Sequence, residues 1–165
     1  MKKPLQLLFF SLFTISMYSQ HYTRDVGFRG GTFPGLSYRL YNGESNAIEG
    51  IVSLGQRGLR LTLLKEQLQP ALLKYSDNFQ FVYGYGVHAG FSYTNRYDIL
   101  FRTYRTDNWH VAPLIGLDAI LALEYQFREF PFTIGLEYKP FFEFSTHRIF
   151  YLFLEDVALS FKYNF

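Results

Sequence analysis

Apolar and polar residues alternate with a period of two through most of the chain after residue 25. In the last segment, Val157–Phe165, every odd position is large and apolar and every even position is small or polar. A period of two is typical of β-strands, and no long stretch has the i, i+3, i+4, i+7 spacing of an amphipathic helix. The pattern predicts eight strands: Val26–Phe33, Leu36–Tyr41, Ala47–Leu54, Leu59–Lys65, Phe79–Phe91, Leu117–Phe127, Phe132–Lys139 and Val157–Phe165.

Side-chain volume indicates which way the apolar face of these strands points. The apolar positions are rich in Phe and Tyr, whereas the opposite positions carry Gly, Ala and charged residues. The interior of an eight-stranded barrel is only just wide enough for ordinary side chains, so the aromatic set would overfill it. The apolar face should therefore point outward into lipid, where only helices or closed barrels satisfy the backbone. We expect an all-β, eight-stranded antiparallel transmembrane barrel with up-and-down meander topology; a soluble secreted barrel is the alternative that the volume argument disfavours.

The N-terminus has the organisation of a secretory signal peptide. Lys2 and Lys3 precede an apolar stretch, Leu5–Met17, which Tyr18, Ser19 and Gln20 follow. Thirteen residues would form a helix of roughly 20 Å, too short for a hydrocarbon core of about 30 Å, so a membrane anchor fits less well. We therefore expect a signal peptide over residues 1–19 and a barrel domain over residues 20–165; a buried first helix is the alternative.

Composition narrows the possibilities further. Of the 165 residues, 48% are apolar and 18% charged, which is not the composition of a disordered chain. The net charge of +2 is too small to indicate nucleic-acid binding. The sequence has no Cys, so neither disulfides nor a lipoprotein-type export signal is expected.

The order of the strands predicts which connections lie on each side of the membrane, if both termini are periplasmic. Ser92–Pro113, the longest connection, would then be extracellular, and Arg128–Pro131 a tight periplasmic turn. Gln67–Asn78 would also be periplasmic, although it is long for such a turn. Two aromatic girdles are expected. The periplasmic girdle comprises Phe79, Phe81, Tyr125, Phe127, Phe132, Tyr163 and Phe165, and the outer one Phe91, Tyr93, Phe141, Phe142, Phe144, Phe150, Tyr151 and Phe153.

The exported N-terminus, the even number of amphipathic strands and the terminal Phe165 resemble the outer-membrane β-barrel proteins of Gram-negative bacteria. In those families, a terminal pattern like Phe161, Tyr163 and Phe165 is the signal that the barrel-assembly machinery reads. More narrowly, GFRGGTFPGLSYRLYNGESNAIEGIVSL and LDAILALEYQF resemble a family of small outer-membrane barrels of unassigned function, over nearly the whole mature chain. The resemblance implies an outer-membrane location and contact with lipid and lipopolysaccharide. It implies no established chemistry.

Charged residues occur at the positions that should face the lumen. The basic ones are Arg29, Arg39, Arg60, Lys139 and Lys162, and the acidic ones are Glu49, Asp118, Glu124 and Glu137. Because an unpaired buried charge costs several kcal/mol, we expect these groups to pair into a structural plug. The alternative is a narrow gated pore for ions or small solutes, which eight strands leave little room for.

Two further roles can be weighed from the sequence. Some eight-stranded barrels that resemble this one in size modify lipid A, and Ser92, His88 and Asp118 could form a nucleophile, base and carboxylate if the strand register aligned them. The stretches Tyr93–Asp98 and Phe101–His110 combine aromatics with Arg, as binding surfaces and lipopolysaccharide contacts do. No metal-ligand motif is evident. We expect a monomer in a structural or surface-interaction role, with no catalysis, cofactor or metal.

Overall fold

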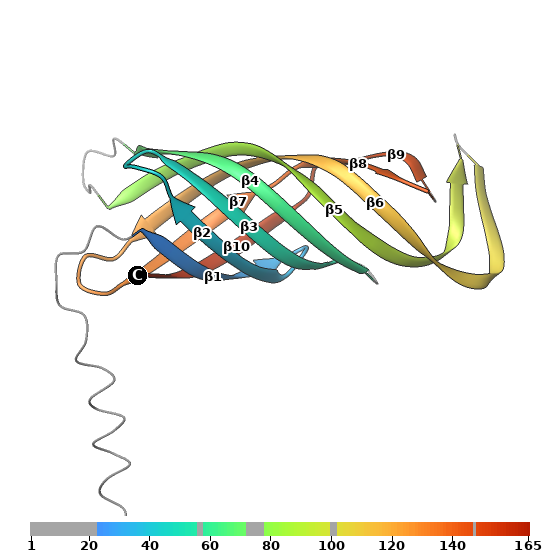
Figure 1. Cartoon of the computed structure of the whole chain (residues 1–165), viewed down its shortest axis with the longest axis horizontal. Coiled ribbons are helices and arrows are strands. Elements are labelled where there is room, and N and C mark those ends of the chain that lie inside the picture. Colours follow the sequence, from blue (N-terminus) through green and yellow to red (C-terminus); the bar gives the residue numbers. More distant parts are fainter. Residues whose placement is uncertain (1–22, 56–57, 72–77, 100–101, 147) are drawn as a thin grey trace, which may run out of the picture.

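A computed structural model describes residues 23–55, 58–71, 78–99, 102–146 and 148–165, so the predicted signal peptide lies outside the described residues. In this part of the chain, ten strands form a closed barrel (Figure 1). They are β1 (Arg24–Gly31), β2 (Gly35–Tyr41), β3 (Asn46–Gly55), β4 (Gly58–Pro70), β5 (Phe79–Ile99), β6 (Arg102–Gln126), β7 (Phe132–Tyr138), β8 (Phe141–Ser145), β9 (Arg148–Phe153) and β10 (Val157–Asn164). No described segment forms an α-helix with the length and hydrophobicity needed to cross a membrane.

The ten strands occupy eight positions around the barrel wall, each of which is here called a stave; two of the staves consist of two strands placed end to end. Strands β7 and β8 both pair with β6 in one continuous register, since Leu121 faces Tyr138 and Asp118 faces Phe141. Strands β10 and β9 follow them as the next stave, and β10 then pairs with β1 to close the barrel. The predicted all-β, eight-stranded antiparallel barrel is therefore confirmed.

The sequence pattern missed β8 and β9 because two features hide their alternation. Pro140 separates β7 from β8 and has no N–H to donate to a neighbouring strand. Phe141 then points inward and is buried, although the following position is also Phe. Between β9 and β10, Leu154 and Glu155 are both exposed, because one extra residue is inserted there, as in a β-bulge.

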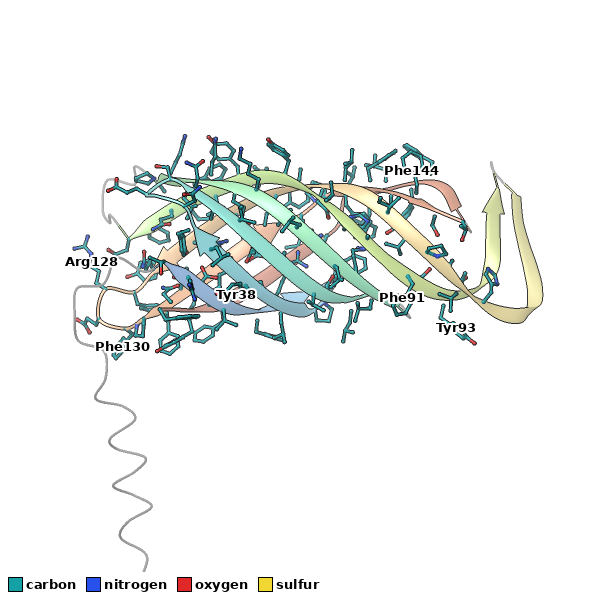
Figure 2. The ribbon with its side chains drawn as sticks, viewed as in Figure 1. Tyr38, Phe91, Tyr93, Arg128, Phe130 and Phe144 are labelled. Carbon is teal, nitrogen blue, oxygen red and sulfur yellow. The ribbon has the colours of Figure 1, made fainter. Side chains whose placement is uncertain are left out.

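The barrel has two different ends. The terminal end carries Arg24, Phe165 and the connections β2–β3, β4–β5 and β6–β7; Arg128 and Phe130 lie in the last of these (Figure 2). The opposite end, here called the hairpin end, carries the β1–β2, β3–β4, β5–β6 and β8–β9 connections. The β5–β6 hairpin extends well beyond the other strands at this end (Figure 1).

This projecting hairpin corrects the prediction that Ser92–Pro113 is a loop. Strands β5 and β6 continue as a paired ribbon as far as Ile99 and Arg102, with a shift of register between Thr94 and Arg96. A ribbon beyond the barrel rim has no lumen on one side, so nothing imposes alternation on its sequence. The terminal-end connection predicted over Gln67–Asn78 is also shorter than expected, because β4 extends to Pro70.

The outer face of the barrel is apolar. Phe28, Leu61 and Leu159 are 56%, 54% and 63% exposed, and Tyr38, Phe91 and Phe144 likewise point away from the wall (Figure 2). Inward positions are often occupied by glycine where strands approach closely: a Cβ on Gly86 would lie 2.0 Å from the carbonyl oxygen of Leu63. The direction of the apolar face predicted from side-chain volume is therefore confirmed.

The predicted outer aromatic girdle is only partly correct. Phe142, Phe144 and Phe150 form an aromatic cluster, and the last two are exposed on the outer face. Phe141 is instead buried inside the barrel, where it stacks on Phe153 with a centroid separation of 5.3 Å. The prediction assigned all these aromatics to the exterior because it did not recognise the alternation of β8 and β9.

Candidate functional site: the charged lumen

The interior of the barrel contains a connected network of charged side chains. All nine residues predicted for the lumen lie in it, none more than 6% exposed: Arg29, Arg39, Glu49, Arg60, Asp118, Glu124, Glu137, Lys139 and Lys162. Five further buried ionisable residues join them: Asp25, Glu66, His88, Glu143 and Asp156. The parity of the predicted strands could have identified Asp25 and Glu66, since each continues the inward positions of its strand.

The first part of the network, here called the terminal-side cluster, consists of Asp25, Arg39, Glu49, Glu66, Glu124 and Lys162. Arg39 is at its centre and donates two hydrogen bonds of 2.9 Å to the two carboxylate oxygens of Glu124. Its Nε lies 2.8 Å from Glu66 Oε2, and its terminal nitrogens lie 3.6 Å from carboxylate oxygens of Asp25 and Glu49. One fully buried guanidinium thus faces four carboxyl groups contributed by four other strands.

Lys162 provides the second positive charge of this cluster and links it to the rest of the lumen. Its Nζ lies 2.9 Å from Glu124 and 3.1 Å from Glu49. It is also 3.4 Å from one oxygen of Glu137, whose other oxygen accepts a 2.9 Å hydrogen bond from Arg29 Nε. Glu137 lies on β7 and Arg29 on β1, and β10 runs between these two strands. The carboxylate of Glu137 therefore connects the two neighbours of β10.

The second part, here called the hairpin-side cluster, consists of Arg29, Arg60, His88, Asp118, Glu137, Lys139, Glu143 and Asp156. Arg29 donates to Asp156 at 3.0 Å and also to the carbonyl oxygen of Phe33. Lys139 donates to Asp118 at 2.8 Å and lies 3.5 Å from Asp156. Asp156 therefore links Arg29 on β1 to Lys139, which follows β7. Lys139 extends this link to Asp118 on β6.

His88 lies between two carboxylates at the hairpin end of this cluster. Its Nδ1 is 2.6 Å from Asp118 Oδ2, and its Nε2 is 3.4 Å from Glu143 Oε2. The ring occupies the space above Gly116, where a Cβ would lie 2.4 Å from His88 Cε1. Glu143 in turn accepts a hydrogen bond from Arg60. Glycine at position 116 is therefore the residue that leaves room for the imidazole.

Aromatic rings close the hairpin end of the lumen. Phe33, Phe141 and Phe153 contact one another with centroid separations between 5.3 and 5.6 Å. The guanidinium of Arg60 lies 4.2 Å from the ring centroid of Phe141 and 4.7 Å from that of Phe33, in cation–π geometry. This group of Phe33, Phe141 and Phe153 with Arg60 is called the aromatic plug below.

Apolar side chains close the terminal end. Ala47, Leu68, Val82 and Ala122 form a buried cluster against which Tyr41 packs. The hydroxyl of Tyr41 donates a 2.7 Å hydrogen bond to Asp25, so the ring joins this cluster to the charged network. The charged side chains are thus enclosed between two apolar layers, an arrangement suited to holding the wall rigidly.

The possible catalytic triad does not assemble. His88 and Asp118 are in contact, but His88 faces Gly116 across the β5–β6 ladder whereas Ser92 faces Ala112. Four residues along a strand separate the two positions by about 13 Å. Among the described residues, no group of three or more His, Asp or Glu has an arrangement suited to a metal ion. His110 lies on the projecting hairpin, and His147 lies outside the described residues.

The predicted assembly-signal residues are on the outer face of the closing strand. Phe161, Tyr163 and Phe165 are 48%, 39% and 44% exposed. Phe161 faces Phe28 across the β1–β10 seam, and Tyr163 stacks on Phe165 with a centroid separation of 6.1 Å. The ring of Phe132 lies 5.0 Å from that of Phe161 and 5.5 Å from that of Tyr163, measured between centroids, and so connects them. The role of the three predicted residues in assembly stays a prediction.

No protein-family model matches the chain, and no curated protein matches its sequence. Function must therefore be argued from the geometry of the barrel.

Proposed function

We propose that this protein is an integral outer-membrane β-barrel of a Gram-negative bacterium, exported through a cleaved signal peptide, with a structural or surface-interaction role and a plugged lumen. The observation that carries this proposal is the inversion of the usual distribution of side chains. Large apolar residues cover the outside of the barrel, while fourteen of the described ionisable residues are buried inside. Water would make this exterior unfavourable, whereas lipid would favour it.

The contacts inside the lumen favour a plug over a pore. Ion pairs at 2.5–3.6 Å connect the network from Asp25 to Arg60, and apolar layers lie at both ends. A solute could pass only if several of these pairs separated together, and each broken buried pair is expected to cost about 3–5 kcal/mol. The proposal includes no catalytic activity, since Ser92 is far from the pair of His88 and Asp118.

The projecting β5–β6 hairpin is the part of the molecule best placed for a surface interaction. It extends past the barrel rim at the end opposite to Arg24 and Phe165 (Figure 1). Its sequence contains Arg96, Arg102, Arg105 and several aromatic residues. Such residues suit contacts with lipopolysaccharide phosphates or with a protein partner.

Cell fractionation tests the proposed location. We expect the protein in the outer-membrane fraction, resistant to alkaline carbonate extraction, with a gel mobility in SDS that changes on boiling. We also expect the mature chain to lack residues 1–19, which mass spectrometry of the intact protein would detect. Recovery of a folded protein in a soluble fraction without detergent would overturn the proposal.

Planar-bilayer recordings test the plug. We expect no discrete conductance from the wild-type protein, and unchanged lipid A by mass spectrometry after expression. Salt-dependent conductance steps altered by Glu137→Gln or Arg60→Gln would establish the pore alternative. A change in the acylation of lipid A would establish the enzymatic one.

A further inference from the structure

The buried network contains more acidic than basic groups. Among the residues that the structure describes, eight buried carboxyl groups belong to it, against five buried lysine and arginine side chains, a surplus of three. The sequence prediction of five basic and four acidic residues missed this surplus, because Asp25, Glu66, Glu143 and Asp156 were not assigned to the lumen. Each of these groups is at most 6% exposed, so bulk water cannot compensate for the difference in charge.

The surplus is unevenly divided between the two clusters. The hairpin-side cluster has four acids, Asp118, Glu137, Glu143 and Asp156, and three fixed cations. Its charges balance when His88, in contact with two of these carboxylates, carries a proton. The terminal-side cluster has four acids and two cations, and no histidine of the described part of the chain lies among them to balance the surplus of two.

Unsatisfied carboxylate oxygens in the terminal-side cluster indicate where the missing positive charge should be. Both oxygens of Glu49, both of Glu66 and Oδ1 of Asp25 are buried without a hydrogen-bond donor in the structure. Arg39 Nε lies at ion-pair distance from Glu66 Oε2, and Lys162 Nζ does so from Glu49 Oε1, but neither contact has the orientation of a hydrogen bond. Glu49 and Glu66 both lie beside the guanidinium of Arg39. Two ionised carboxylates cannot satisfy each other, since neither has a proton to donate.

We propose that the terminal-side cluster is a proton-binding site, in which Glu66, with Glu49 and Asp25, holds one or two protons at neutral pH. A proton fits better than a metal cation, because Arg39 and Lys162 already occupy the space between the carboxylates. This inference concerns the lumen and does not depend on where the barrel resides.

The strands packed around the site contribute these charged or titratable groups among the described residues. They are Asp25 on β1, Arg39 and Tyr41 on β2, Glu49 on β3, Glu66 on β4, Glu124 on β6, Glu137 on β7 and Lys162 on β10. On β5, the residues facing Glu66 and Leu68 are Gly84 and Val82, which are uncharged. The proton uptake proposed for this site therefore belongs to its acidic residues, and it is separate from that of His88 in the hairpin-side cluster.

The site predicts an unusual dependence of stability on pH. At pH 6–8 the unfolded chain has ionised Glu and Asp, while the folded lumen retains protons, so folding takes up protons. Stability should then fall as pH rises. Each proton retained in the folded state raises the unfolding equilibrium constant about tenfold per pH unit. This is opposite to a carboxylate stabilised by a salt bridge, which loses its contribution at low pH.

The test is urea unfolding of the purified barrel in detergent, followed by far-UV circular dichroism between pH 6 and pH 8. We expect Glu66→Gln to flatten the pH dependence by about tenfold per pH unit relative to wild type. Asp156→Asn is the matched control, since it replaces an equally buried carboxylate outside the terminal-side cluster that accepts a 3.0 Å hydrogen bond from Arg29. It should leave the slope unchanged. His88 contributes the same slope to wild type and to Glu66→Gln, so it cancels in their comparison.

The results distinguish a bound proton from a bound metal cation and from a fully ionised cluster. An unchanged slope in Glu66→Gln would overturn it. Stabilisation of the wild type by Na⁺, K⁺ or Mg²⁺ at constant ionic strength, without a change of slope in the variant, would assign the charge to a metal cation instead. Glu49→Gln is the second variant, with the same expectation. Failure of both Gln variants to fold would also contradict the proposal, because Gln replaces a protonated carboxyl group with little change in shape.

Discussion

Replacing Arg39 with methionine tests whether the lumen network stabilises the barrel. Methionine keeps a long flexible chain but removes the guanidinium, and with it both 2.9 Å bonds to Glu124. It also removes the positive charge 2.8 Å from Glu66 and 3.6 Å from Asp25 and Glu49. Four carboxyl groups would then face Lys162 alone.

The expected loss of stability follows from burial. Arg39 and the carboxylates around it are at most 2% exposed. Removing one partner of a buried pair typically costs about 3–5 kcal/mol, whereas an exposed pair contributes about 0–1 kcal/mol. We expect Arg39→Met to reach the upper part of the buried range, because it leaves several carboxylates without compensation.

Urea unfolding in detergent, with the heat-dependent shift in gel mobility as a second probe, measures this loss. Arg39→Lys keeps the charge but cannot donate two parallel bonds to Glu124, so its loss should be intermediate. If Arg39→Met does not fold, the loss of stability measured for Arg39→Lys provides the test instead. Adding Glu124→Gln to Arg39→Met should restore part of the stability, with a coupling energy of about 1 kcal/mol or more. A loss below about 1 kcal/mol for Arg39→Met would refute the reasoning.

Three further substitutions test other parts of the structure. Gly116→Ala should cost about 1–3 kcal/mol in urea unfolding, because the added methyl would meet the ring of His88 and a backbone oxygen. Phe141→Ala should cost about 3–5 kcal/mol in the same assay, because it opens a cavity in the aromatic plug. Phe165→Ser should reduce the amount of heat-modifiable protein in outer-membrane fractions while leaving refolding of the purified chain in detergent nearly unchanged.

Each of these substitutions has a matched control. Gly50→Ala has only one atom within 4 Å of its Cβ and should be nearly neutral. Phe144→Ala removes an exposed ring and should cost less than about 1 kcal/mol. Phe28→Ser lies on the same outer face as Phe165 and should leave assembly in cells intact. Equal effects in a variant and its control would contradict the corresponding assignment of clash, burial or assembly signal.

Much of the barrel could be predicted because side-chain volume and alternation are local properties. In β10, the change from Leu159 to Ser160 to Phe161 already identifies the outward and inward faces. The nine predicted lumen residues follow from the same parity. The alternation does not identify β8, because Phe141 and Phe142 are both aromatic although they point to opposite sides of the wall. It also does not identify the projecting part of the β5–β6 hairpin, which has no lumen on either side.

The sequence by itself determined the class of fold and the direction of its apolar face, because both depend on neighbours one or two positions apart. Only the tertiary structure decided which charges meet. Arg39 and Glu124 are 85 residues apart along the chain, and their contact depends on strand tilt and on the closure of the barrel. The surplus of carboxyl groups around Arg39 likewise emerges only when five strands place their inward residues together. Pairing of charges across a lumen is a property of register, and register is set by the whole closed sheet.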